Sequence, residues 1–165
     1  MPATTKVPLG ASTNVRKWYL DVNTGTFAAP TWVGVFGVMD FKPGIEPTLQ
    51  DDSDMDGGGF KSQTKTAEAW ALELKVSRKV TAASPTAYDP GQEVLRIKSI
   101  GTFGPANQVD IRYYEMEPSG PRVEAYRGFA STAWKPDGGP MDATDTVSVT
   151  LTGQGRLTPI AHPDV

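Results

Sequence analysis

The chain has 165 residues, with 16 Lys and Arg against 19 Asp and Glu, and a net charge of −3. This length favours a single domain with one core, and the charge argues against a large basic face that would grip nucleic acid. Because there is no Cys, disulfides, thiolate metal ligands and Cys nucleophiles are excluded. No segment has the apolar character of a signal peptide or a membrane span, so we expect synthesis in the cytoplasm and no membrane binding by this chain.

The N-terminal part of the sequence predicts an arm followed by a strand. Residues 1–15 are polar and small, which is typical of an arm that becomes ordered only when something docks on it. Residues 16–22 alternate as a strand, with Trp18, Leu20 and Val22 on one face. We expect a single β-domain to span residues 16–153.

The next part predicts two strands joined by a long acidic loop. Residues 31–41 read as a strand that ends at Pro43-Gly44. Residues 46–63 are predicted to form an exposed loop, because residues 46–60 hold five carboxylates and no base, include three consecutive glycines, and have too little apolar surface to pack as core. Residues 66–80 alternate as a long half-buried strand. Its predicted inner face consists of Trp70, Leu72, Leu74 and Val76.

A calcium site in the acidic loop is the first hypothesis to weigh. Residues 52–57 fit the first half of the calcium-loop pattern, which makes Asp52, Asp54 and Asp56 weak candidate ligands. The second half fails, because the position of the bidentate carboxylate is Gln63 and the flanking segments do not read as helices. We therefore predict no metal and no cofactor, and favour an acidic loop that is solvated or meets a basic partner surface.

One helix is predicted, at residues 89–101. Asp89 can cap its first turn, Pro90 suits the first helical position, and Gly101 can end it. Val94, Ile97 and Ile100 form the apolar stripe that we expect to face the core.

The C-terminal half returns to strands. Residues 109–117 and 122–134 predict a hairpin, with a bulge or bend at Gly128. Residues 145–152 are the last predicted strand, and residues 154–165 are expected to form a C-terminal arm. The chain is thus mainly β. We expect an antiparallel β-sandwich or half-open barrel with one flanking α-helix, a long acidic loop and extended terminal arms.

No catalytic constellation is found, so we do not expect an enzyme. His162 is the only His, and its Pro-rich tail favours a solvated side chain over a base or ligand. Glu115 and Glu117 lie on the same face of a predicted strand and could form a carboxylate pair, which keeps a hydrolase open as an alternative. A solvated strand face is the favoured interpretation of these two residues.

The order of these segments resembles the major tail (tail tube) proteins of long, non-contractile-tailed bacteriophages, the siphophages. The resemblance covers roughly residues 16–155. It is carried by five pieces, which are Trp18–Thr26, Trp32–Pro43 with Glu46-Pro47, Asp51–Asp54 with Gly57–Gly59, the strand around Trp70, and the late Gly-rich turn with the final strand.

The resemblance implies a structural virion protein without catalytic activity. Family members form six-fold rings that stack into a tube, through whose lumen DNA passes without specific binding. The resemblance further implies that the long loop and the arms reach neighbouring subunits, and that other tail proteins contact the tube ends. An inner-tube protein of a contractile tail or injection device, and a calcium-dependent β-sandwich binding module, remain alternatives.

We hypothesise that the acidic loop docks on a basic surface of a neighbouring copy. An acidic loop beside a basic strand suits such head-to-tail contact. The candidate contact residues are Glu46, Asp51, Asp52, Asp54, Asp56, Lys61, Lys65, Lys75 and Lys79.

Overall fold

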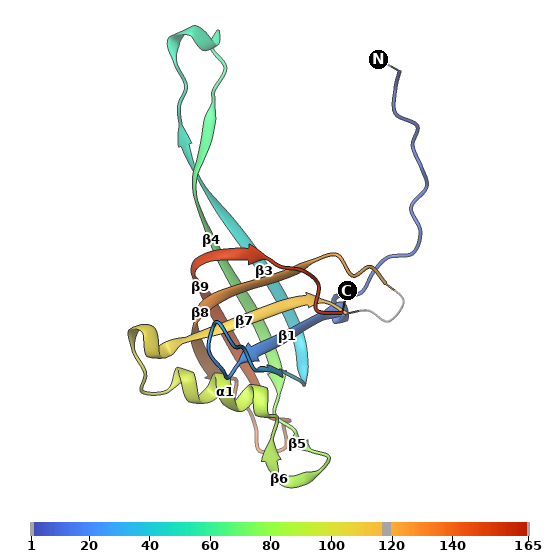
Figure 1. Cartoon of the computed structure of the whole chain (residues 1–165), viewed down its shortest axis with the longest axis vertical. Coiled ribbons are helices and arrows are strands. Elements are labelled where there is room, and N and C mark those ends of the chain that lie inside the picture. The colour runs from blue at the N-terminus through green and yellow to red at the C-terminus, as the bar shows by residue number, and fades with distance from the viewer. Residues whose placement is uncertain (1, 117–119, 165) are drawn as a thin grey trace.

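The computed structural model describes residues 2–116 and 120–164, and shows a mainly β chain with one α-helix (Figure 1). The larger sheet has seven antiparallel strands in the order β2-β1-β7-β8-β9-β4-β3. Its strands are β1 (Trp18–Asn23), β2 (Trp32–Gly34), β3 (Val38–Asp51), β4 (Gln63–Ser77), β7 (Gln108–Glu115), β8 (Ala125–Pro136) and β9 (Thr146–Pro159). A small second sheet pairs β5 (Val80–Thr81) with β6 (Ser84–Tyr88). The helices are α1 (Pro90–Ser99) and the short 3₁₀ turns η1 (Val15–Lys17), η2 (Met55–Gly57) and η3 (Gly104–Asn107).

The large sheet curls until its two ends face each other. Trp18 of β1 stacks on Phe41 of β3 with ring centroids 5.8 Å apart, although many strands separate them in the sheet. The core lies inside this curl, where the alternating residues of each strand point inward. The predicted mainly β, antiparallel fold with one flanking helix is therefore confirmed, and the half-open curl is the form that it takes.

The inward faces predicted for residues 16–22 and 66–80 are confirmed. Leu20 and Val22 of β1 are buried, and so are the predicted residues of β4. On β9 the buried residues are Val147, Val149 and Leu151. The predicted irregularity at Gly128 is also confirmed, because the register between β8 and β9 shifts between Arg127 and Phe129.

The helix forms where it was predicted, but it turns a different face to the core. The carboxylate of Asp89 caps the first turn by accepting a hydrogen bond from the backbone N–H of Gln92 at 3.0 Å. Leu95 is fully buried, whereas Ile97 and Ile100 are exposed. The prediction that Ile97 and Ile100 face the core is therefore wrong. The buried face includes Gln92 and Leu95, Ile97 lies about 200° around the helix from Leu95, and Ile100 follows the last helical residue.

The acidic loop is shorter than predicted, because strands occupy both of its ends. β3 continues through Pro43 and Gly44 to Asp51, and β4 begins at Gln63, so that the connection is residues 52–62. Pro43 can lie inside β3 because β3 is an edge strand, and a residue without an N–H group is tolerated there.

The chain end also differs from the predicted arm. β9 includes residues 154–159, which were assigned to a C-terminal arm, and His162 beyond it is buried rather than solvated. Gly153 and Gly155 resemble loop signals in the sequence. In the structure Gly153 instead makes room for the indole of Trp70, which occupies the space that a Cβ atom would need.

Candidate assembly surfaces

The most prominent surface is a two-stranded hairpin that projects from the body of the protein. β3 and β4 remain paired from Lys42 opposite Glu73 out to Asp51 opposite Gln63, and every residue from 42 to 69 is exposed. At about 3.3 Å per residue, the outer ten residues of β3 reach roughly 30 Å. Figure 1 shows this hairpin extending along the longest dimension of the molecule. An isolated hairpin is only marginally stable in water, so this geometry is typical of a segment that has a partner.

The tip of the hairpin is held by hydrogen bonds within its own loop. Asp52 N–H and Ser53 Oγ both donate to the carbonyl of Ser62, at 3.1 Å and 3.2 Å. The carboxylate of Asp54 accepts from the N–H of Asp56 at 3.1 Å and caps the short η2 turn. Gly58 and Gly59 follow with positive φ angles of 64° and 86°, which close the turn without steric cost.

The carboxylates at the tip are committed to this loop rather than gathered around a common point. Hydrogen bonds from Ser53 lower the pKa of Asp51, and the bond from the Thr64 hydroxyl is the largest cause of the lowered pKa of Asp52. In residues 2–116 and 120–164 no group of three or more His, Cys, Asp or Glu side chains is placed to hold a metal ion. Strands, not helices, flank the loop, so the helix–loop–helix frame of an EF-hand is not formed here.

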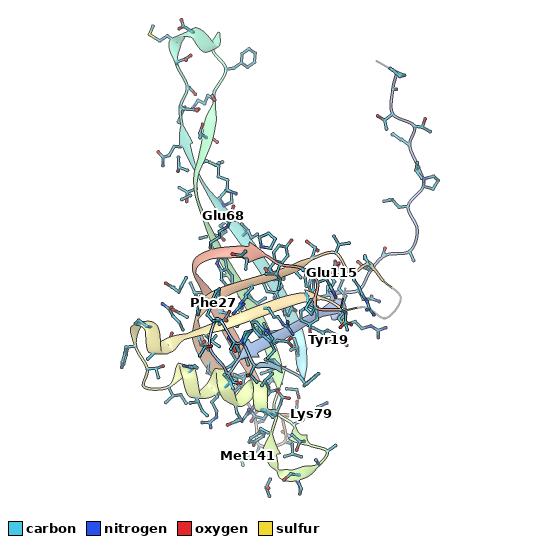
Figure 2. The ribbon with its side chains drawn as sticks, in the orientation of Figure 1. Tyr19, Phe27, Glu68, Lys79, Glu115 and Met141 are labelled. Carbon is cyan, nitrogen blue, oxygen red and sulfur yellow. The ribbon has the colours of Figure 1, made fainter. Side chains whose placement is uncertain are left out.

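Within the described residues of one chain, the predicted basic contact residues form no ion pair with the carboxylates of the acidic tip. Lys61 lies beside the tip, and Lys65 lies on the same hairpin, where its ammonium pairs with the carboxylate of Glu68. Lys75 pairs with Asp137 at 3.3 Å on the body of the protein. Figure 2 shows Lys79 near the end of the molecule opposite the tip, so any contact between the tip and this residue has to join two copies.

The outer face of the central strands is polar and carries mostly small side chains. On β4 and β9, Ala71 lies opposite Thr152, Glu73 opposite Thr150, and Lys75 opposite Ser148. On β8 the residues in register with these are Ser131, Ala133 and Lys135. The same strands bury their apolar residues on the inner face, so one side of this sheet is core and the other is water.

The four strands β8-β9-β4-β3 have an unpaired edge at each end of the group. β3 has no neighbour on its outer side within the described sheet order. The pairing of β8 with β7 ends at Ser131, which lies opposite Gln108. The next backbone N–H of β8, that of Thr132, donates instead to the side-chain oxygen Oδ1 of Asn107 at 3.1 Å. Beyond that point, to Pro136, no strand of the described residues pairs with β8 on that side. Such edges are sites for pairing with another chain.

Glu115 is buried and contacts both terminal segments, the first through its carboxylate and the second through its backbone carbonyl, although its sequence pattern was interpreted as a solvated face. Glu115 accepts hydrogen bonds from Lys17 Nζ at 2.7 Å and from the N–H groups of Val123 and Glu124 at 3.1 Å and 3.3 Å. Burial alone would raise the pKa of Glu115, but these donors together lower it to about 2. His162 Nε2 lies 2.5 Å from the carbonyl oxygen of Glu115.

This arrangement speaks against the carboxylate-pair interpretation at Glu115, since that side chain is saturated by structural partners. Glu117, the other member of the predicted pair, lies outside the described residues. One pattern in the sequence does indicate that Glu115 is buried. Glu115 continues the alternating series Val109, Ile111 and Tyr113, whose side chains face inward. The partner Lys17 is distant in sequence and could not be inferred from that pattern.

No protein-family model and no curated protein sequence matches this chain. No helix in the described part of the chain is long and apolar enough to cross a membrane.

Solved structures show the fold clearly. The chain is similar to a chain from the virion of a native gene transfer agent particle, with a TM-score of 0.61, 10% identity, and coverage of 91% of this chain and 100% of that one. A chain from the tail of an empty gene transfer agent particle, refined with C6 symmetry, gives a TM-score of 0.61, 11% identity and the same coverage.

The likeness extends to two further assemblies. The SPP1 tail tube gives a TM-score of 0.63 at 12% identity, covering 88% of this chain and 78% of that one. A chain from the baseplate of the anti-feeding prophage gives 0.53 at 8% identity, covering 96% and 99%. The chain therefore has the fold of these tail, tube and baseplate proteins.

Proposed function

We propose that this chain is a structural, non-enzymatic subunit of a phage-type tail tube, which assembles with copies of itself into stacked six-fold rings. The observation that carries the proposal is the shared fold with a tail solved with C6 symmetry and with a tail tube, over about nine-tenths of the chain. The projecting hairpin and the unpaired strand edges support it, since both need partners that a single chain does not supply.

The ring is built by joining sheets of neighbouring copies edge to edge. The unpaired edge of β3 in one copy meets the unpaired end of β8 in the next, so that β8-β9-β4-β3 continues around the ring. Barrel closure of this kind removes the exposed edges.

The outer face of these strands then lines the channel through which DNA passes. Its small and hydroxyl-bearing residues, such as Ser131, Thr150 and Thr152, leave a smooth wall. Two of its cations are neutralised locally, because Lys42 pairs with Asp40 at 3.2 Å and Lys75 pairs with Asp137 at 3.3 Å. DNA is held by Lys and Arg side chains placed against its phosphates. With Lys42 and Lys75 paired, Lys135 is the one Lys named on this face that has no ion pair in the described residues, and a wall with so few free cations lets DNA move without specific binding.

The hairpin joins one ring to another. Its acidic tip, with Asp51, Asp52, Asp54 and Asp56, lies at one end of the long axis, and Lys79 lies near the other (Figure 2). Stacking along this axis brings the tip of one copy toward the opposite end of a copy in the adjacent ring, where Lys75 and Lys79 are candidate contacts. Glu46 and Lys65 on the hairpin shaft, and Lys61 in the tip loop, are further candidate contacts. At the tube ends, other tail proteins replace the missing ring.

Negative-stain electron microscopy of the purified protein at high concentration tests this proposal. Tubes or rings with a central channel are the expected result. A protein that stays monomeric both alone and with preformed tail-tip complexes as templates would contradict it. The inner tube of a contractile device is the nearest alternative, since the baseplate likeness reaches a TM-score of 0.53. Reconstitution with a sheath protein distinguishes the two, because only an inner tube would be coated by it.

A further inference from the structure

The body of the protein contains an open apolar groove between β1 and the segment that leads into β3. The groove has a volume of about 630 Å³. Val35 N–H donates to the carbonyl of Leu20 at 2.9 Å, and this is the last link between the two segments before they separate. Gly37, with φ 76°, then turns the chain away toward β3. The main apolar lining residues are Trp18, Tyr19, Leu20, Phe36, Met39 and Phe41.

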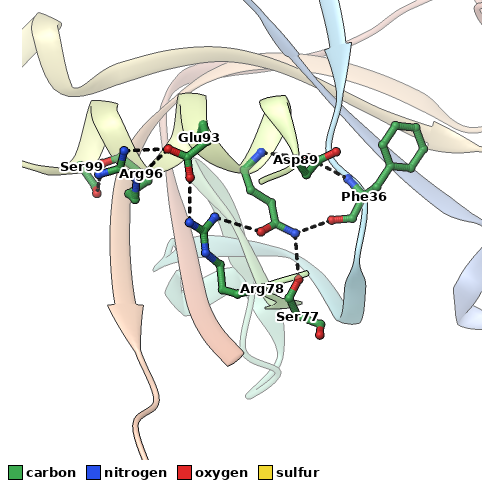
Figure 3. Close-up of polar contacts among 8 residues, drawn as sticks. Phe36, Ser77, Arg78, Asp89, Glu93, Arg96 and Ser99 are labelled. Carbon is green, nitrogen blue, oxygen red and sulfur yellow. Dashed lines mark hydrogen bonds and ion pairs between the residues drawn. The ribbon is translucent and has the colours of Figure 1, made fainter. Parts of the chain in front are cut away.

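The wall of this groove is held in place by the start of α1. The carboxylate of Asp89 accepts from Phe36 N–H at 3.3 Å, and Gln92 Nε2 donates to the carbonyl of Phe36 at 2.6 Å (Figure 3). Gln92 also donates to the carbonyl of Ser77 at 3.1 Å. Phe36 and Met39 are nevertheless 65% and 61% exposed. The groove is thus a fixed feature on which Phe36 and Met39 lack cover.

The other end of the same helix carries an exposed apolar protrusion. Ile97 and Ile100 are 59% and 62% exposed, and Phe103 is 85% exposed. We call these three residues the knob. Asn107 fixes it to the body, since its side chain donates to the carbonyls of Lys98 at 2.9 Å and Thr132 at 3.2 Å. Adjacent exposed apolar residues of this size are typical of an interaction site.

The knob and the groove lie on opposite sides of the molecule. α1 spans the distance between them, about 15 Å for its ten residues. In Figure 1 the turn after α1 is at the left, while Tyr19 at the groove is on the right in Figure 2. One copy therefore cannot place its own knob in its own groove. Two different surfaces that meet between copies make a head-to-tail contact, which closes into a ring when the rotation allows it.

Each surface also borders one of the unpaired strand edges. The groove includes Val38, Met39 and Phe41 of β3, and the knob is tied through Asn107 to Thr132, where the unpaired end of β8 begins. Joining the β3 edge of one copy to the β8 edge of the next thus brings a groove against a knob.

The main charges beside the two surfaces are paired within the chain. Arg96 beside the knob pairs with Glu93 at 2.6 Å, and Asp40 at the rim of the groove pairs with Lys42 at 3.2 Å. What the two surfaces offer each other is therefore exposed apolar area rather than opposite charge.

We infer that the knob of one copy occupies the groove of the next copy, and that this contact sets the head-to-tail order of the ring. The inference rests on the proposed function and names the contact by which the ring closes.

Cross-linking of assembled protein tests this contact, and the absence of native Cys makes the test clean. The variant Met39→Cys/Phe103→Cys is assembled and treated with a short bis-maleimide, then separated on a denaturing gel. A ladder of covalent oligomers that ends at the ring size is expected. The control, Met141→Cys/Phe103→Cys, uses an even more exposed methionine outside the groove and should stay largely monomeric on the gel.

Two results would overturn the inference while leaving the proposed function intact. The first is rings seen by microscopy that yield no ladder with the groove–knob pair. The second is a ladder that appears with Leu9→Cys/Met39→Cys instead, because it would place the N-terminal arm of another copy in the groove. If the unmodified protein forms neither rings nor tubes, the proposed function fails as well.

A disruption variant gives an independent measurement. Phe103→Asp should raise the subunit concentration needed for assembly at least about tenfold, as for loss of a central interface residue. Met141→Asp should leave that concentration unchanged. Because both side chains are exposed, the melting temperature of the monomer should not change in either variant. Unimpaired assembly of Phe103→Asp would contradict the inference.

Discussion

The indole of Trp70 lies so close to the backbone of Gly153 that a Cβ atom at Gly153 would be 2.4 Å from Trp70 Cε2 and Nε1. Trp70 also donates from Nε1 to the carbonyl of Gly155 at 3.0 Å. β4 and β9 therefore meet at this point through a ring that only glycine accommodates, at the base of the projecting hairpin.

Gly153→Ala should therefore destabilise the monomer. The added methyl group forces the buried indole or the β9 backbone to move, which costs about 1–3 kcal/mol of unfolding free energy. Denaturant unfolding followed by Trp fluorescence measures the change. Gly44→Ala is the control, because the nearest atom to its Cβ would be the Ala71 carbonyl oxygen at 4.0 Å, and its effect should stay within about 0.5 kcal/mol. Equal stability of the two variants would show that the Trp70 site can relax.

Glu115 should make the folded protein acid-sensitive. Burial would raise its pKa, but the bonds from Lys17, Val123 and Glu124 lower it from 4.5 to about 2 in the folded state. A lowered pKa stabilises the fold above pH 4.5, and this contribution is lost as the pH falls from about 4.5 to about 2. The full contribution is on the order of 3 kcal/mol, at about 1.4 kcal/mol per pKa unit.

Unfolding free energies of the monomer across this pH window test that contribution. Glu115→Gln should lose less stability on acidification than the unmodified protein, because it has no carboxylate to protonate at this site. Asp142→Asn, at an exposed carboxylate, should keep the original pH slope. Comparing variants is necessary because Asp137, whose pKa is also about 2, titrates in the same window. A Glu115→Gln slope equal to that of the unmodified protein would contradict the assignment.

The strands of the body could be predicted because each has one buried face. Val147, Val149 and Leu151 alternate with Thr and Ser along β9, and this period follows directly from the pleat. The outer hairpin shows no such alternation, since both of its faces are exposed, and Pro43-Gly44 looks like a strand end unless β3 is known to be an edge. The extent of that hairpin depends on pairing with β4, which a local pattern does not encode.

The candidate surfaces were only partly visible in the sequence for the same reason. The acidic tip is a contiguous run and was identified by composition alone. Ile97 and Ile100 were assigned to the core because apolar residues at helical spacing usually pack inward, whereas here the face with Gln92 and Leu95 is buried and Ile97 lies on the opposite side of the helix. The Lys17–Glu115 pair joins residues far apart in the chain, and only the folded structure brings them together.

Removal of the N-terminal arm should weaken assembly without destabilising the monomer. Residues 2–14 have no regular secondary structure and are all exposed, so deleting residues 2–13 removes no part of the core. Asn14 is kept because its carbonyl accepts from Lys17 N–H at 3.2 Å. We expect the unfolding free energy to stay within about 0.5 kcal/mol, while the concentration needed for tube formation rises at least about tenfold. Sedimentation and electron microscopy measure assembly, and normal tubes from the truncated chain would rule out a role for the arm.

The acidic tip offers the most direct test of ring stacking. In the variant with Asn at Asp51, Asp52, Asp54 and Asp56, the monomer should remain folded, because an Asn oxygen can still accept the bonds that close the loop. Assembly should weaken, since exposed charge pairs contribute about 0.2–1 kcal/mol each, and four of them change the assembly constant by about 4-fold to several hundred-fold.

Added salt should likewise weaken assembly of the unmodified protein, because salt screens exposed charges. The matched control, Asp142→Asn/Asp145→Asn, removes exposed carboxylates from the body and should assemble normally. If single rings still form in the tip variant but do not stack, the hairpin acts between rings, whereas unchanged tubes would show that the tip charges have no part in assembly.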